Sequence, residues 1–184
     1  MDELLDIVDE NNKPLGFNKP RREAHRDGDW HRTVHIYVVN SKGEFLVHLR
    51  SPKKDLNPSK WDTRFGGHLV AGSTVEDTAI SELWQEIGIK CRFDDLVRGG
   101  VFKHHFGGNS EFNNVFYYGF RGRLSDLNFN DSEVIEIKWM PIDMIIEAMT
   151  KEPQAWTSHP DRFRKVIKDY QILKGRADSS FLIE

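Results

Sequence analysis

A glycine turn between a β-rich segment and an amphipathic segment is the feature that most constrains how this chain folds. Residues 61–65 favour a strand, and Gly66 and Gly67 follow them directly. Beyond the turn, apolar side chains recur at the spacing of one helix face: Ile80, Leu83 and Ile87. The pattern predicts a strand, a tight turn and a helix over residues 73–87.

Both ends of this helix carry recognisable signals. Ser73 and Glu76 have the spacing of a capping box, in which each side chain accepts a hydrogen bond from an otherwise unpaired backbone N–H. Gly88 follows the last apolar residue and suits the left-handed conformation that ends many helices. We therefore expect a well-defined helix that begins at Ser73.

The remaining chain alternates between β-rich segments and polar stretches. Strands are expected over seven segments: 4–8, 33–39, 45–49, 61–65, 97–106, 112–120 and 134–140. Residues 19–29 and 50–60 are predicted to be loops, and Gly107, Gly108 and Asn109 a turn. Prolines at the first helical position open two later helices, 141–149 and 160–174. This order predicts an α/β (α+β) fold with a mixed sheet between helices.

Composition excludes several classes of function. With 38% hydrophobic and 30% charged residues, the chain is expected to fold as a globular protein. Its net charge of -3 provides no basic field, so binding to a nucleic acid polymer is not expected. Cys91 is the only cysteine, which excludes an intrachain disulfide and a zinc site made of thiolates. No stretch is apolar enough for a signal peptide or a membrane span, so a cytoplasmic protein without membrane contact is expected.

The predicted central helix places two carboxylates together. Glu82, Gln85 and Glu86 lie at positions i, i+3 and i+4, so their side chains leave the helix on one face. Mg²⁺ and Mn²⁺ bind such oxygen ligands together with phosphate oxygens, and Gly66 and Gly67 would let the backbone approach the ion or the phosphate. A solvated helix surface is the alternative for this group.

The whole segment resembles the Nudix box, whose pattern is G-x5-E-x7-R-E-U-x-E-E-x-G-U with U aliphatic. Six positions match: Gly67, Glu82, Leu83, Glu86, Gly88 and Ile89. Three positions depart from it: Ser73 and Gln85 replace glutamates, and Ser81 replaces the arginine. The resemblance implies an α/β/α sandwich over residues 31–165, with 1–30 as an extension and 166–184 as a helix and tail. It also implies a divalent metal at Glu82, Gln85, Glu86 and Gly66, weakened by the neutral Gln85.

A narrower resemblance involves histidines. His25, His31 and His68 are similar in order to the three metal ligands of type-1 isopentenyl diphosphate isomerases, with the first interval one residue shorter. This implies a second metal position, although His25 and His31 are equally well explained as loop or packing residues. The isomerase reaction uses a cysteine and a glutamate, and here Gly66 and Asn114 stand in their places. We therefore expect an isomerase-like architecture without isomerase activity.

The resulting hypothesis is a metal-dependent hydrolase that cleaves a diphosphate linkage in a small molecule, either a nucleoside diphosphate derivative or a prenyl or other organic diphosphate. The resemblance makes Glu111, expected in a loop, the first candidate for the base, and Glu86 the second. Gly67, Lys103 and His105 are candidates for phosphate binding, or Lys103 and His105 are simply exposed strand residues.

Several alternatives stay open from the sequence. A catalytically weak or inactive Nudix module that binds a phosphorylated ligand is one, and an isomerase-like enzyme is another. Four aromatic residues could line a ligand pocket or belong to the core: Trp30, Tyr37, Trp61 and Phe65. The N-terminal extension could offer an edge for pairing into a homodimer.

Overall fold

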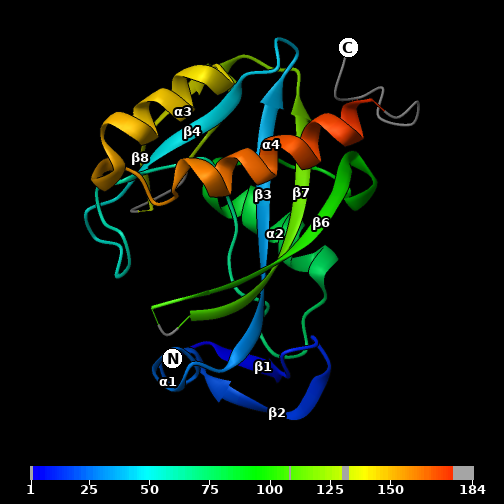
Figure 1. Ribbon diagram of the computed structural model, residues 1–184. Helices are drawn as coiled ribbons and strands as arrows, with labels where there is room; N and C mark the ends of the chain where they lie inside the picture. Colours follow the sequence, from blue (N-terminus) through cyan, green and yellow to red (C-terminus); the bar gives the residue numbers. More distant parts are fainter. Residues whose placement is uncertain (1, 108, 130–132, 176–184) are drawn as a thin grey trace.

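The computed structural model describes residues 2–107, 109–129 and 133–175 (Figure 1). Its strands are β1 (Leu4–Val8), β2 (Pro14–Pro20), β3 (Trp30–Asn40), β4 (Phe45–Arg50), β5 (Trp61–Asp62), β6 (Leu96–Phe106), β7 (Asn109–Phe120) and β8 (Val134–Met140). Its α-helices are α1 (Arg21–Asp27), α2 (Val75–Ile87), α3 (Ile142–Lys151) and α4 (Pro160–Lys174). Short 3-10 turns are η1 (Phe93–Asp95), η2 (Leu124–Asp126) and η3 (Pro153–Ala155).

Strand β3 is the centre of a mixed sheet. It runs parallel to β7 over its whole length and antiparallel to β4. Strand β8 pairs with β4, and β6 pairs with β7, both antiparallel. The β1–β2 hairpin joins the sheet where Val8 pairs with Trp30, at the beginning of β3. The β3–β7 register sets His31 directly beside Glu111, so these two polar residues from distant parts of the chain become neighbours.

Two helical layers cover the sheet, as Figure 1 shows, with α3 and α4 on one face and α2 on the other. The alternation of side chains along β3 creates both cores. Val34, Ile36 and Val38 pack with the α2 residues Leu83 and Ile87. The odd-numbered residues Tyr37 and Val39 pack instead with residues of α3 and α4. Each fully buried apolar side chain of this kind stabilises the fold by about 1.5–3 kcal/mol. The predicted mixed sheet between helices is confirmed.

The prediction of a loop over residues 19–29 was wrong, because helix α1 occupies most of it. Pro20 precedes the helix, and Gly28 ends it at a φ of 74°, a left-handed conformation that suits glycine. The helix has one buried residue, Ala24, which packs against Leu5 and Ile7 of β1. A single apolar residue produces no periodic pattern, so the stabilising contacts were invisible in the local sequence.

Helix α2 forms close to where it was expected, but its cap is shifted by one residue. Thr74 is the N-cap, and its hydroxyl accepts a 3.0 Å hydrogen bond from the Asp77 backbone N–H. Ser73 and Glu76 therefore do not form the predicted capping box. The helix ends as predicted at Gly88, whose φ is 71°.

Three smaller differences concern strand and helix ends. Strand β5 stops at Asp62, while Phe65 forms an isolated bridge with Ile36. Strand β7 begins at Asn109, so Glu111 lies in a strand and not in a loop. Pro141 is the N-cap of α3 and not its first helical residue. The predicted turn at Gly108 lies outside the described residues.

Within the described ranges, no helix combines the length and apolar character needed to cross a membrane.

Candidate metal and catalytic site

A cavity of about 450 Å³ opens where the start of β3, the start of β7, α2 and the segments 50–57 and 62–68 meet. Its wall is strongly charged. The carboxylates that line it are Glu3, Asp55, Asp62, Glu82, Glu86, Glu111 and Glu133. The lysines and arginines are Arg21, Arg50, Lys53, Lys54 and Arg64. With seven acidic and five basic side chains, the wall carries a net negative formal charge.

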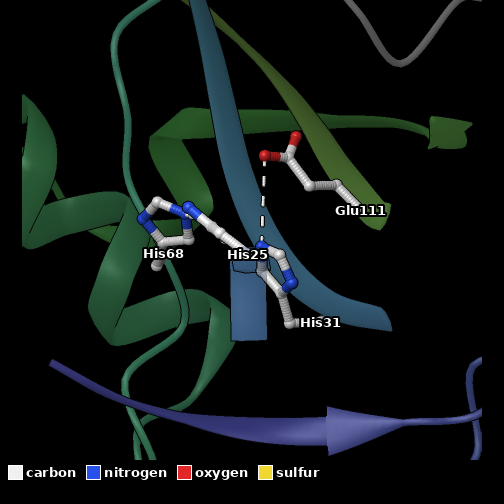
Figure 2. Close-up of side chains that lie close together, drawn as sticks. All are labelled: His25, His31, His68 and Glu111. Atoms are coloured by element: carbon white, nitrogen blue, oxygen red, sulfur yellow. Dashed lines mark hydrogen bonds and ion pairs between the residues drawn. The ribbon is translucent and has the colours of Figure 1, made fainter. Parts of the chain in front are cut away.

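Three histidines and one glutamate meet beside this cavity (Figure 2). His25 comes from α1, His31 from the first residues of β3, His68 from the segment before α2, and Glu111 from β7. One potential ligand atom from each lies within 4.8 Å of the others. Ligands of one transition metal ion lie about 2 Å from it, and hence about 3–4 Å from one another. The cluster therefore has the dimensions of a metal site.

His31 is oriented so that one ring nitrogen faces the cluster. Its Nδ1–H donates a 2.9 Å hydrogen bond to the Asp29 carbonyl oxygen, which leaves Nε2 as the nitrogen with the lone pair. Nε2 is fully buried, has no hydrogen-bond partner among the described residues, and lies 4.0 Å from the Glu111 carboxylate. A buried polar atom of this kind is costly unless something binds it, so its position favours a cation here.

The other members of the cluster are held in ligand-competent protonation states. Burial, and then the positive charge of Arg21, lower the pKa of His68 to about 3. Burial also lowers the pKa of His25, and the charge of Arg21 contributes to this shift. Burial opposes ionisation of Glu111, but the Arg64 guanidinium and other partners outweigh it and lower the Glu111 pKa. Neutral imidazoles and an ionised carboxylate are the forms that bind metal.

Two residues that the sequence analysis missed fix the position of Glu111. The Asn113 side-chain N–H group donates to the Glu111 carboxylate at 2.9 Å and to the Thr33 hydroxyl at 2.8 Å. The Arg162 guanidinium, from α4, donates to the Asn113 side-chain oxygen at 2.6 Å. Strand alternation places Asn113 on the same face as Glu111 and could have indicated it, whereas nothing local connects Arg162 with the site.

A second group of donors lies at the glycine turn. Glu86 is buried, and its carboxylate accepts a 2.9 Å hydrogen bond from the Gly66 backbone N–H. A Cβ atom on Gly67 would overlap the Glu82 carboxylate. The missing side chain at Gly67 thus lets Glu82 lie against the turn, which is the physical reason for glycine at this position of the box.

The surroundings of Glu82 and Glu86 destabilise the charged form of each carboxylate. Burial, and then Glu133 and Glu3, raise the pKa of Glu82 to about 7. Burial and the charge of Glu82 raise the pKa of Glu86 to about 8, while the Gly66 hydrogen bond opposes the shift. A buried and a half-buried carboxylate that repel each other are stabilised by a cation, so the electrostatics of the pair fit a metal site.

The departures from the Nudix box have a local structural explanation. Gln85 lines the cavity, and its side-chain N–H donates a 2.6 Å hydrogen bond to the Ser81 hydroxyl one helical turn earlier. The amide oxygen of Gln85 is the atom that would face a cation. The two departures at Ser81 and Gln85 therefore form a pair, in place of the arginine and glutamate of the full pattern.

The catalytic cysteine of the isomerase pattern cannot stand at Gly66 in this backbone. A Cβ there would overlap the Val34 carbonyl oxygen, and the φ of 138° strains any other residue. Cys91 lies beyond α2, and burial raises the pKa of its thiol. Asn114 donates to the Thr33 carbonyl oxygen at 3.1 Å, a structural role. Gly66 and Asn114 therefore have roles in the backbone packing of this fold at the two positions of the isomerase pattern.

Lys103 and His105 lie on one face of β6, outside the cavity wall. The Lys103 ammonium donates a 2.7 Å hydrogen bond to the Glu10 carbonyl oxygen and lies 4.6 Å from the centre of the Trp30 ring. His105 is paired with the Ser110 hydroxyl at 2.8 Å. Both side chains are used in contacts within the fold, so the geometry does not bring these two phosphate candidates to the site.

Comparison with models of protein families identifies the family of this chain. Residues 29–162 match the family model described as "NUDIX domain". The chain belongs to the Nudix family. The matched range includes His31, the glycine turn, helix α2 and Glu111.

Similar Nudix proteins include both hydrolases and isomerases. The chain is 32% identical to "Nudix hydrolase 3" of Arabidopsis thaliana over 86% of its own length, although it spans only 22% of that protein. It is 34% identical to an uncharacterized Nudix hydrolase of Clostridium acetobutylicum, over 77% of this chain and 71% of the relative. It is 26% identical to the isopentenyl-diphosphate Delta-isomerase of Pectobacterium atrosepticum, over 83% and 84%.

Solved structures show the same fold. The crystal structure of a Deinococcus radiodurans protein superposes with a TM-score of 0.72 at 23% identity, covering 91% of this chain and 99% of that one. The Nudix domain of Shewanella oneidensis NrtR, solved with ADP ribose, superposes with a TM-score of 0.58 at 11% identity, covering 77% and 87%. This Nudix chain therefore shares the fold of both solved structures.

Proposed function

We propose that this Nudix chain is a metal-dependent hydrolase that cleaves the diphosphate linkage of a small molecule. The observation that carries the proposal is that two groups of metal-binding donors face one charged cavity. Glu82 and Glu86 lie at the glycine turn, and His25 and His68 lie beside Glu111. A purely structural role would not require ligand sets of two different kinds around one solvent-filled space.

The charge of the cavity wall supports a requirement for cations. A diphosphate is strongly anionic, and the ionised carboxylates of the wall, Glu111 among them, repel it. The residues fit Mg²⁺ or Mn²⁺ at Glu82, Glu86 and the Gln85 amide oxygen, with a second ion at His25, His31 and His68. Divalent cations supply charge neutralisation for the diphosphate oxygens and acidify nearby water.

The chain's own residues provide the remaining functions. Arg21, Lys53 and Arg64 line the cavity and would bind phosphate oxygens. In the hydrolysis, a water oxygen bonds to one phosphorus while the bond from that phosphorus to the bridging oxygen breaks. Glu111 takes one proton from the water, and the bridging oxygen leaves as part of the second phosphate. Glu111 is ionised and so able to accept a proton, because Arg64 and the Asn113 hydrogen bond lower its pKa against the effect of burial.

Glu86 is the weaker candidate for the base. Burial and Glu82 raise its pKa to about 8, which matches a group that needs a cation to remain ionised. One carboxylate oxygen of Glu86 already accepts a hydrogen bond from the Gly66 N–H, so this oxygen is not free to accept a proton from water. We therefore assign Glu86 to metal binding and Glu111 to proton transfer.

Release of inorganic phosphate with Mn²⁺ tests the proposal, with three diphosphate esters as substrates: adenosine diphosphate, ribose 5-diphosphate and isopentenyl diphosphate. We expect turnover of at least one ester by the native chain and a loss of 100-fold or more in Glu86→Gln. Glu76→Gln is the matched control, because Glu76 lies on the same helix but is paired with Arg98 at 2.8 Å outside the cavity wall. Activity that survives in Glu86→Gln would refute the site.

The assignment of the base has its own readout. Glu111→Gln should abolish turnover while His25, His31 and His68 still bind one equivalent of Mn²⁺, as measured by equilibrium dialysis. Binding of all three esters without turnover in the native chain would instead favour the ligand-binding module. Deuterium from solvent entering the carbon skeleton of isopentenyl diphosphate would favour an isomerase.

A further inference from the structure

The chemical character of the cavity wall limits which organic group the diphosphate can carry; the inference rests on the proposed function. Small-molecule pockets are usually lined mainly by apolar and aromatic side chains. Here Leu56 is the single large apolar side chain of the wall among the described residues, and it is 46% exposed. An apolar prenyl group would bury almost none of its surface against such a wall, so the hydrophobic effect would contribute little to its binding.

The aromatic residues that could stack on a nucleobase lie elsewhere. Tyr37 and Phe65 are buried in the two cores. The Trp30 ring packs on Phe112 at a centroid distance of 5.0 Å, and the Trp61 ring packs on Trp156 at 6.3 Å. None of these rings lines the cavity. A nucleobase would therefore find no tryptophan, tyrosine or phenylalanine ring to stack on there.

One side of the cavity is formed by a loop that follows β4, residues 51–60, which is firmly attached to the sheet. The Arg50 guanidinium donates to the carbonyl oxygens of Leu56 at 3.0 Å and Asn57 at 3.2 Å. The Lys54 ammonium forms a 2.7 Å ion pair with Glu133, and the Ser51 N–H donates to the Glu133 carbonyl oxygen at 2.8 Å. The loop is thus held in place before any ligand binds.

Two polar side chains of this loop are available to a ligand. Asp55 and Asn57 both line the cavity, and neither side chain has a hydrogen-bond or ion-pair partner among the described residues. A carboxylate accepts two hydroxyl protons, and an amide both donates and accepts. Together these two exposed side chains at the rim of the cavity match a group with several neighbouring hydroxyls, which both donate and accept hydrogen bonds.

We infer that the substrate is a diphosphate ester of a small polyhydroxylated group, such as a sugar, whose hydroxyls bind Asp55 and Asn57 of the 51–60 loop. The diphosphate then lies toward the glycine turn and Glu111, on the other side of the cavity. Neither an apolar chain nor a nucleobase contributes to recognition. Selectivity follows from the wall, because an apolar chain would form no hydrogen bond with Asp55 or Asn57.

Three esters with the same terminal diphosphate test this inference. Ribose 5-diphosphate and adenosine diphosphate differ only in the adenine base, whereas isopentenyl diphosphate carries an apolar chain. We expect kcat/KM for ribose 5-diphosphate to exceed that for isopentenyl diphosphate by tenfold or more, and to equal or exceed that for adenosine diphosphate. A tenfold preference for either of the other two esters would overturn the inference.

Two variants locate the recognition in the loop. Asn57 has a φ of 52°, so Asn57→Gly removes the amide while the backbone keeps a conformation that glycine adopts freely. Asn57→Gly and Asp55→Ala should each lower the ratio of kcat/KM for ribose 5-diphosphate over isopentenyl diphosphate by about tenfold. Asp143→Ala, an exposed acidic residue on α3, is the surface control and should leave the ratio unchanged. Unchanged ratios in both loop variants would refute the assignment.

Ligand-induced shifts of the melting temperature separate this inference from the proposed function. In Mn²⁺, full-length protein should be stabilised more by ribose 5-diphosphate than by isopentenyl diphosphate, whether or not either is hydrolysed. If no ester turns over but this order holds, the hydrolase proposal fails and the recognition of a hydroxylated group stands. If turnover occurs with the opposite order, the recognition fails and the hydrolase stands.

Discussion

The Asn113 side-chain amide donates a 2.9 Å hydrogen bond to the Glu111 carboxylate from two residues away on the same strand. Asn113 is itself held, since Arg162 donates to its side-chain oxygen at 2.6 Å and its N–H group also contacts Thr33. An amide whose oxygen is bound by a guanidinium cannot flip. The N–H group therefore always faces Glu111, and one carboxylate oxygen stays directed at the histidine cluster.

Removing this contact should damage turnover more than folding. We expect Asn113→Ala to lower kcat by about tenfold, because Glu111 becomes free to rotate, and to cost about 1–3 kcal/mol of stability for the unpaired Arg162 group. Phosphate release and urea unfolding measure the two effects. Asn114→Ala is the matched control, because Asn114 donates only to backbone oxygens and its loss should lower stability alone. Equal effects of the two variants on kcat would contradict the role of Asn113.

The glycine turn predicts a variant that folds but loses metal. In Gly67→Ala the new methyl group would overlap the Glu82 carboxylate, a flexible group that can move away. We expect Mn²⁺ affinity at this site to fall by tenfold or more, with the melting temperature of the metal-free protein little changed. Gly175→Ala is the control, because its backbone angles suit alanine and its nearest atoms lie at ordinary distances of 3.6–3.7 Å. Unchanged Mn²⁺ affinity in Gly67→Ala would be inconsistent with the close approach of Glu82.

The histidine cluster predicts a countable metal equivalent. His31→Ala removes the buried Nε2 that faces the cluster, so the protein should bind one Mn²⁺ or Zn²⁺ equivalent fewer than the native chain in equilibrium dialysis. The stabilisation that saturating metal gives to the native fold should shrink in parallel. His159→Ala, an exposed histidine at the start of α4, should retain the native stoichiometry. If His31→Ala retained it too, the cluster would not be a metal site.

Part of the stability that the folded protein loses at low pH should come from His48. This residue is buried against the Phe65 ring at a centroid distance of 4.6 Å. Burial, with Asp62 opposing it, lowers the pKa of His48 from 6.5 to about 4. Because the folded pKa lies below the unfolded value, the neutral ring contributes full stability above pH 6.5, and this contribution is lost as the pH falls toward 4.

In His48→Leu this component disappears. Between pH 6.5 and 4 the free energy of unfolding should fall by up to about 3 kcal/mol less than in the native protein. Urea unfolding at a series of pH values measures the difference. Parallel profiles for His48→Leu and the native chain would contradict the prediction.

Local sequence patterns predicted much of the fold for an understandable reason. Residues 34–39 alternate between two apolar faces, and Leu83 and Ile87 recur at helical spacing. The local sequence therefore indicates which side of each element is buried. Helix α1 was missed because its stabilising contact, Ala24 against Leu5 and Ile7, joins distant parts of the chain. The cap of α2 was displaced by one residue because Ser73 and Thr74 are equally good capping residues, and only the backbone geometry selects Thr74.

The candidate site, like the fold, could be predicted from the sequence only in part. The sequence by itself determined the glycine turn and the helix that presents Glu82 and Glu86, because turn geometry and helical spacing act over a few residues. The three histidines were indicated only by their resemblance to the metal ligands of the isomerases. Only the tertiary structure decided that His31 lies beside Glu111, that Asn113 and Arg162 hold this glutamate, and that Lys103 lies outside the cavity. These relationships depend on strand register and helix packing, which are set by burial across the whole chain and not by neighbouring residues.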